Sequence, residues 1–193
     1  MTIEEFVRYV SDPDRLVRQL RAAAAISEGL RPSGLWPIVV GGAAVEFYTR
    51  GAYTTVDVDM IVEGLAEIDA VLRDLGFTRL AGTSYVHPQV DVVVDLLPEP
   101  LTGDARRVVE VDVDGRKARI IGLDDILADR LRAAVYWSDL SSKEWAVQMM
   151  AAQWEHIDWA YLDELATVEQ PAFVEVLSEC RQMAKAVVDG SPA

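Results

Sequence analysis

The apolar positions of the chain recur first at helical spacing. Between Ser11 and Gly29 they fall every three or four residues, which predicts a helix with one buried face. Ser11 stands where an N-cap is expected, and Pro13 lies in the first turn, where its missing N–H costs nothing. The role of this helix is expected to be structural.

Further along the chain the period changes to two. A short apolar run over residues 35–40 ends in Gly41-Gly42, and a helix is expected to follow over residues 43–48. The clearest strand is predicted over residues 54–62, where Val56, Val58 and Met60 alternate with Asp57, Asp59 and Ile61. The predicted order is therefore strand, tight glycine turn, helix, strand.

The next segments continue as a mixture of helices and strands. An amphipathic helix is expected over 65–75, closed by Gly76, and strands are expected over 77–80, 84–87 and 90–97. Two more strands, over 108–113 and 117–121, flank Asp114-Gly115, a dipeptide that favours a type I′ hairpin turn.

After residue 121 the pattern is helical, over 124–137, 142–157, 158–168 and 171–188. This change predicts an α+β protein with a soft boundary: residues 1–121 form a domain with a mixed sheet flanked by helices, and residues 122–193 form a helical C-terminal region. Because no flexible linker separates them, we expect the helices to pack directly on the sheet.

Charge and composition narrow the class of protein. The net charge of -14 disfavours non-specific association with nucleic acid. The chain has a single cysteine, Cys180, and it has neither an apolar run of membrane length nor a basic leader at its start. We therefore expect a cytoplasmic protein without a membrane segment, whose metal chemistry would use oxygen ligands or its two histidines.

Aspartates occur inside two apolar strands, where they are normally depleted. Residues two apart in a strand share a face at about 6.6 Å, so Asp57 and Asp59 project side by side. By the same alternation Asp91 and Asp95 share a face of the strand at 90–97. Three carboxylates converging from two strands would repel one another without a cation, and Mg²⁺ prefers such hard oxygen ligands. Two ions can clamp both oxygens of a displacement at phosphorus.

The glycine turn offers the complementary half of such a site. Glycines let the backbone approach a phosphate, and a helix that follows them directs its free N–H groups at the anion. Gly41 and Gly42 are therefore candidate phosphate ligands, although a strand-to-helix turn requires glycine for steric reasons as well. The order of turn and aspartates along the chain strengthens both assignments.

The run VVGGAAVEFYTRGAYTTVDVDMIV resembles the nucleotidyltransferase superfamily, whose fold is that of DNA polymerase β. It is most similar to the branch with the AbiEii-like and MenT-like toxin nucleotidyltransferases, over residues 36–97. The resemblance implies that Gly41 and Gly42 hold the triphosphate and that Asp57 and Asp59 bind two Mg²⁺ ions, with Mn²⁺ as a substitute. Asp95 fits the third carboxylate, and Asp91 competes for that role.

The resemblance implies an enzyme that transfers a nucleoside monophosphate from an NTP to an acceptor hydroxyl and releases pyrophosphate. The acceptor stays open between tRNA, another protein and a cationic small molecule. A partner protein, such as an antitoxin, or a second copy of the chain is also implied. Acidity favours a protein or a cationic small molecule, whereas the toxin-like resemblance favours RNA.

Two positions depart from the pattern of the relatives. Tyr53 stands where many of them have an arginine, while Thr55 is retained, and Arg130 stands where a lysine is often found on the first C-terminal helix. Thr55 and Arg130 are expected to lie at the nucleotide. The departures motivate an alternative: a weak or inactive nucleotidyltransferase-fold protein that binds a nucleotide or a partner in a toxin-antitoxin-like system.

The remaining candidates are better explained structurally. His87, beside a proline, and His156, on a helix, have no second ligand at metal spacing. The tryptophans of the C-terminal region are expected to be core residues, although they can also stack a base or form a partner surface. Glu46, on the helix after the glycine turn, is interpreted as a surface carboxylate. A plain oligomerising protein is the third possibility.

Overall fold

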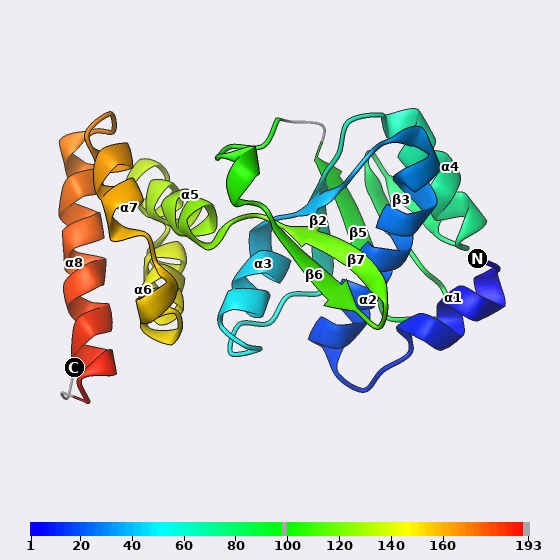
Figure 1. Cartoon of the computed structure of the whole chain (residues 1–193), viewed down its shortest axis with the longest axis horizontal. Helices are drawn as coiled ribbons and strands as arrows, with labels where there is room; N and C mark the ends of the chain where they lie inside the picture. The colour runs from blue at the N-terminus through cyan, green and yellow to red at the C-terminus, as the bar shows by residue number, and fades with distance from the viewer. Residues whose placement is uncertain (98–99, 191–193) are drawn as a thin grey trace.

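The computed structural model describes residues 1–97 and 100–190 and confirms the predicted α+β class. The first part of the chain forms a sheet with helices around it, and the second part is a group of helices beside it (Figure 1). The helix α3, Gly41–Tyr48, lies between the two parts. The candidate site lies where this helix begins.

Seven strands form one mixed sheet in the order β3-β4-β5-β2-β1-β7-β6. Their bounds are β1 Ile38–Val39, β2 Asp57–Ile61, β3 Thr78–Ala81, β4 Ser84–Val86, β5 Val93–Leu97, β6 Val109–Val113 and β7 Arg116–Ile120. The pairs β2–β5 and β1–β7 are parallel, and the other pairs are antiparallel. The two strands with the predicted aspartates, β2 and β5, are thus interior neighbours.

Both of these strands are shorter than the sequence predicts. Val56 precedes β2 and is 59% exposed, and Asp91 precedes β5. The hydrogen-bonded ladder between the two strands begins only at the pair Asp57–Val93. Val56 lies before the ladder and is not part of a buried face, whereas Val90 and Val92, before β5, are still buried at 8% and 0% exposure.

In the described part of the sheet half, the α-helices are α1 Ile3–Val10, α2 Arg15–Leu30, α3, and α4 Leu65–Asp74. The prediction that Ser11 caps the long helix was wrong. Asp14 caps α2 by accepting a hydrogen bond from the backbone N–H of Val17, and Thr2 caps a separate helix, α1. Asp14 succeeds because it directly precedes the first helical residue. Short 3₁₀ turns lie at Arg31–Ser33, η1, and Ala105–Arg107, η2.

The predicted hairpin between β6 and β7 is confirmed. Asp114 has φ of 51° and Gly115 has φ of 83°, so both central residues are in the left-handed region that a type I′ turn requires. The turn fixes the register in which Val113 pairs with Arg116.

The C-terminal region consists of α5 Leu123–Tyr136, α6 Leu140–Ala152, α7 Trp159–Ala166 and α8 Pro171–Val188, with a 3₁₀ turn, η3, at Trp154–His156. The helices α5 and α6 contact α3 of the sheet half. Direct packing of the C-terminal helices on the sheet stays a prediction. The Gln153 side chain of this region donates a hydrogen bond to the Tyr48 carbonyl at 2.8 Å.

The tryptophans do not all lie in the core. Trp137 directly follows the last turn of α5 and is 75% exposed. Trp145 contacts Tyr53, with ring centroids 4.9 Å apart, and Trp154 contacts Trp159 at 4.7 Å. The prediction of a buried role was therefore wrong for Trp137.

A second group of acidic residues connects the loop after β5 to the helical region. Arg107 forms ion pairs with Asp124 at 2.8 Å and with Asp158 at 2.6 Å, and its guanidinium lies 3.7 Å from the Tyr161 ring centroid. The Tyr161 hydroxyl donates to Asp125 at 2.7 Å. We call these five residues the Arg107 network.

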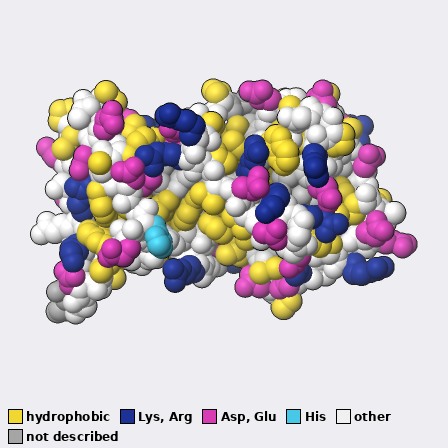
Figure 2. Space-filling view, viewed as in Figure 1, with side chains coloured by type: hydrophobic (Ala, Val, Ile, Leu, Met, Phe, Trp, Pro, Cys, Tyr) yellow, Lys and Arg dark blue, Asp and Glu magenta, His cyan; other side chains and the backbone are white. Residues whose placement is uncertain are grey.

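The surface carries both signs of charge. On the face in Figure 2, acidic and basic side chains are interspersed over the sheet half, and hydrophobic side chains gather between the two halves. Within residues 1–97 and 100–190, none of the helices combines the length and apolar character that a membrane crossing needs.

Candidate active site

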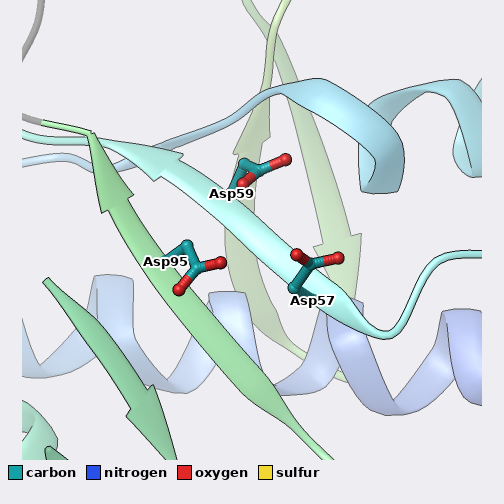
Figure 3. A group of neighbouring side chains, drawn as sticks. All are labelled: Asp57, Asp59 and Asp95. Carbon is teal, nitrogen blue, oxygen red and sulfur yellow. The ribbon is translucent and has the colours of Figure 1, made fainter. Parts of the chain in front are cut away.

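Three carboxylates meet on one face of the sheet. Asp57 and Asp59 come from β2 and Asp95 from β5, and the three side chains project from the same side of the two strands (Figure 3). One carboxylate oxygen of each lies within 4.8 Å of the others. Asp59 and Asp95 are direct partners in the parallel register.

Strand alternation explains why they share a face. Val58 and Met60, between and after the aspartates of β2, are 1% and 0% exposed on the other side of the sheet. On β5, Val94 and Leu96 are likewise buried on that side, at 0% and 2% exposure. Burial of these four side chains fixes the register, since a slip by one residue would place the carboxylates in the core.

The glycine turn abuts the carboxylates. Gly41 has φ of +57°, and a Cβ there would lie 2.1 Å from Oδ2 of Asp59. A Cβ at Gly42 would meet the Thr55 side chain at 3.0 Å and the Tyr53 ring at 3.2 Å. Gly41 is therefore required by the packing of the site itself, Gly42 is tightly packed, and the two glycines let the start of α3 lie against the acids.

The charges of the cluster are not balanced within the protein. Burial raises the pKa of Asp59 to about 6, and the Asp57 carboxylate adds to this effect, whereas a hydrogen bond from the Gly42 N–H opposes it. Across the described ranges, no Lys or Arg forms an ion pair with Asp57, Asp59 or Asp95. A cation from solution would relieve this repulsion.

The residues fit a hard divalent metal ion. Oδ1 of Asp95 is buried and has no hydrogen-bond partner in the structure, which is a costly state for a carboxylate oxygen. Three convergent oxygen ligands, with no sulfur or nitrogen donor among them, are the set that Mg²⁺ and Mn²⁺ prefer. The donor chemistry and the unpartnered oxygen thus agree with the predicted ion.

Thr55 lies immediately beside the cluster. Its hydroxyl donates a hydrogen bond of 2.5 Å to Oδ1 of Asp57. Its backbone N–H donates to Oε2 of Glu46 at 3.1 Å, and its carbonyl accepts from the Gln19 amide at 3.0 Å. Thr55 therefore holds one of the three carboxylates.

Arg130 lines a cavity that includes Asp59. A cavity of about 250 Å³ is lined by Gly41, Asp59, Ile126 and Arg130, among others. The guanidinium is hydrogen-bonded to the adjacent Asp129, and its charge acts to lower the pKa of Asp59. The helix α5 thus brings the only cationic side chain that lines this cavity among the described residues.

The competing candidate, Asp91, lies elsewhere. Its side chain is 79% exposed and pairs with Arg18 at 3.6 Å. The prediction that Asp91 and Asp95 lie on the same face of one strand was wrong, because β5 begins after Asp91. The geometry brings Asp95, and not Asp91, to the two acids of β2.

The surroundings of His87 agree with its structural interpretation, whereas the role of the exposed His156 stays a prediction. His87 is 2% exposed, and its Nε2 lies 3.2 Å from the Leu75 carbonyl. Its ring packs against Phe6 and Phe77 at about 5 Å. Burial lowers the pKa of His87, which favours the neutral ring.

Two features of the site were missed from the sequence. Glu46 was expected at the surface, yet it is 3% exposed and reaches Thr55. Gln19 is 1% exposed and reaches the same residue from α2. No local pattern marks either residue, because each meets Thr55 only after α2 and α3 have packed together.

Known structures share the arrangement of the chain. The sequence matches no protein-family model and no curated protein. An antigenic nucleotidyltransferase-like protein from Paracoccidioides brasiliensis aligns with a TM-score of 0.54 at 13% identity, over 68% of this chain and 75% of that chain. Two structures of ANT(2'')-Ia also align. The complex with adenylyl-2''-tobramycin has a TM-score of 0.45 at 16% identity, over 72% of this chain and 99% of that one. The solution structure of this antibiotic-resistance factor has a TM-score of 0.46 at 15% identity, over 98% of both chains.

These likenesses concern the fold. The narrower resemblance to AbiEii-like and MenT-like toxins stays a prediction. The polypeptide has the nucleotidyltransferase fold.

Proposed function

We propose that this protein is a Mg²⁺-dependent nucleotidyltransferase that moves a nucleoside monophosphate from an NTP to an acceptor hydroxyl. The observation that carries the proposal is the convergence of Asp57, Asp59 and Asp95 within 4.8 Å of one another, directly beside the Gly41-Gly42 turn. A structural cluster of acids would be expected to form ion pairs with Lys or Arg, and within residues 1–97 and 100–190 no such pair involves these three aspartates.

In this proposal Asp57, Asp59 and Asp95 hold the metal. Bound there, Mg²⁺ supplies positive charge to the phosphates and orients them for in-line displacement. The start of α3 contributes backbone N–H groups that receive phosphate oxygens, since no side chain caps that end of the helix. Arg130, which lines the same cavity as Gly41 and Asp59, contributes a second positive group toward the triphosphate.

We propose that Asp95 accepts the proton of the acceptor hydroxyl. Its carboxylate lies within the cluster, where a carboxylate can take the proton of a bound hydroxyl. In the reaction the acceptor oxygen forms a bond to the α-phosphorus as the bond to the pyrophosphate oxygen breaks. The acceptor proton passes to the carboxylate, and pyrophosphate leaves.

The acceptor is proposed to be a cationic small molecule or a protein. The net charge of -14 repels a polyanion at long range, and the basic residues are paired with acids over much of the sheet half. The same charge concentrates cations near the cluster. A transfer RNA acceptor is the competing possibility that the toxin-like resemblance favours.

Calorimetric titration of each NTP with Mg²⁺ tests the proposal on three proteins: wild type, Asp57→Asn and Asp91→Asn. We expect metal-dependent binding to wild type and to Asp91→Asn, and loss of binding in Asp57→Asn. The exposed Asp91 is the matched control, because its substitution removes the same charge away from the cluster. Equal binding by all three proteins, or by none, refutes the proposal.

Transfer is then measured with α-labelled NTPs against aminoglycosides, proteins of a cell extract and tRNA. Label that moves to one class identifies the acceptor, and pyrophosphate release confirms the reaction. Metal-dependent binding without transfer to any class would instead support the alternative, a nucleotide-binding protein of this fold without catalytic activity.

A further inference from the structure

Two buried polar side chains hold the residue that contacts Asp57. Glu46, on α3, accepts a hydrogen bond from the Thr55 N–H at 3.1 Å, and Gln19, on α2, donates one to the Thr55 carbonyl at 3.0 Å. Glu46 and Gln19 are 3% and 1% exposed. The Thr55 hydroxyl then donates to Oδ1 of Asp57 at 2.5 Å. A continuous chain of contacts thus runs from the helices to the metal-binding cluster.

The sheet does not hold Thr55. The strand β2 begins at Asp57, so Thr55 lies two residues outside the ladder and would otherwise be fixed only by the loop before it. Its position depends instead on side chains that satisfy both of its backbone groups. If Thr55 could move, the Asp57 side chain could rotate, because the Thr55 hydroxyl donates the hydrogen bond that holds that carboxylate.

Burying a carboxylate is costly, so a favourable interaction must compensate for the burial of Glu46. Its nearest cation, Arg15, lies at 3.7 Å from Oε1, beyond hydrogen-bond length, and the Arg15 Nε has no hydrogen-bond partner. An ideal ion pair therefore does not explain why the acid is buried. Its well-formed contact is the one to the Thr55 N–H.

We propose that Glu46, assisted by Gln19, is a positioning residue that acts through the Thr55 hydroxyl to hold Asp57 in its metal-binding orientation. The inference rests on the proposed function, because it assigns a metal-binding role to Asp57. Outer groups of this kind fix the orientation of a ligand before the ion arrives, and their loss typically weakens metal affinity about 10- to 100-fold.

A double-mutant cycle tests the proposal with Mn²⁺ alone, followed by electron paramagnetic resonance without nucleotide. Glu46→Leu and Thr55→Val are each expected to weaken Mn²⁺ binding about tenfold. The double variant is expected to bind no more weakly than Thr55→Val, because Glu46 then has no hydroxyl through which to act. Glu46→Gln should bind close to wild type, since the amide oxygen still accepts from the Thr55 N–H.

Thermal unfolding of the metal-free proteins separates positioning from general stability. Glu46→Leu is expected to lower the melting temperature equally with and without Thr55→Val, because the Thr55 N–H is unsatisfied in both. Its effect on Mn²⁺ affinity should disappear in the second background. An effect on affinity that persists beside Thr55→Val, or no effect in either background, overturns the proposal.

Two further variants keep the outcome interpretable. Gln19→Met removes the other contact to Thr55 and should also weaken Mn²⁺ binding, so if Glu46→Leu does not fold, unchanged binding by Gln19→Met overturns the proposal. Asp57→Asn is the reference for the site itself. If Asp57→Asn binds Mn²⁺ as wild type does, the proposed function fails. If it loses binding while Glu46→Leu does not, only the positioning role fails.

Discussion

Two groups of buried or partly buried acids in this protein differ in how their charges are matched. In the Arg107 network, Asp124 accepts from Arg107 and from the Asp158 N–H, and Asp125 accepts from the Tyr161 hydroxyl and from the Asp104 N–H. Every one of these carboxylates has a donor. In the site cluster, Asp95 has a buried oxygen without one.

The difference separates a structural role from a binding role. Burial raises the pKa of Asp124 as it does that of Asp59, so burial alone does not distinguish the two groups. The donors do. A matched network holds η2 against α5 and α7 without help from solution, whereas the unmatched cluster is completed only by a cation.

The largest effect is expected where the unmatched cluster is altered. Asp59→Asn should lower the transfer rate at least about 1,000-fold, because it removes a ligand of the ion that supplies several kcal/mol to the transition state. The metal-free variant should be at least as stable as wild type, since one repelling charge is gone. Steady-state kinetics and chemical denaturation measure the two quantities. If Asp59→Asn were less stable than wild type but turned over normally, the site cluster would have a structural role like that of the Arg107 network.

In the Arg107 network the pattern should be reversed. Arg107→Met leaves Asp124 buried without its cation and should lower the free energy of unfolding by about 2 kcal/mol, below the value for a fully buried pair because Arg107 is partly exposed. Mn²⁺ affinity should not change. Urea denaturation and Mn²⁺ titration of the same protein check both parts. Loss of Mn²⁺ affinity would couple the two groups and contradict the comparison.

A smaller effect is expected from pH. The folded-state pKa of Asp59 is raised to about 6, so protonation of this group stabilises the metal-free fold. This contribution is present at about pH 4 and is lost as pH rises through about 6. Mn²⁺ requires the carboxylate, so its affinity should be about tenfold weaker at pH 5 than at pH 7. Titrations of wild type and Asp59→Asn isolate this group, and identical profiles would contradict the assignment.

The smallest effect is expected at Asp91. Asp91→Asn removes an exposed ion pair with Arg18 and should change the free energy of unfolding by less than about 1 kcal/mol. It should leave Mn²⁺ affinity and transfer unchanged, although the sequence made it a rival of Asp95. Weakened metal binding by Asp91→Asn would instead support Asp91 as a metal ligand.

Local patterns predicted much of this fold correctly. The alternation around Asp57 and Asp59, the Asp114-Gly115 turn and the change to helices after residue 121 each depend on neighbours within a few residues. Those signals are carried by side-chain periodicity and backbone preference. Errors occurred where burial depends on distant segments: Glu46 is buried beside α2, and Trp137 is 75% exposed.

The sequence by itself determined that two aspartates share one face of a strand beside a glycine turn, because strand periodicity is local. Only the tertiary structure decided between Asp91 and Asp95, since the parallel register of β2 and β5 sets Asp95 opposite Asp59. It also decided that Glu46 reaches Thr55 and that α5 carries Arg130 to the same cavity. Such contacts join segments far apart in the chain, and packing of the whole core selects them.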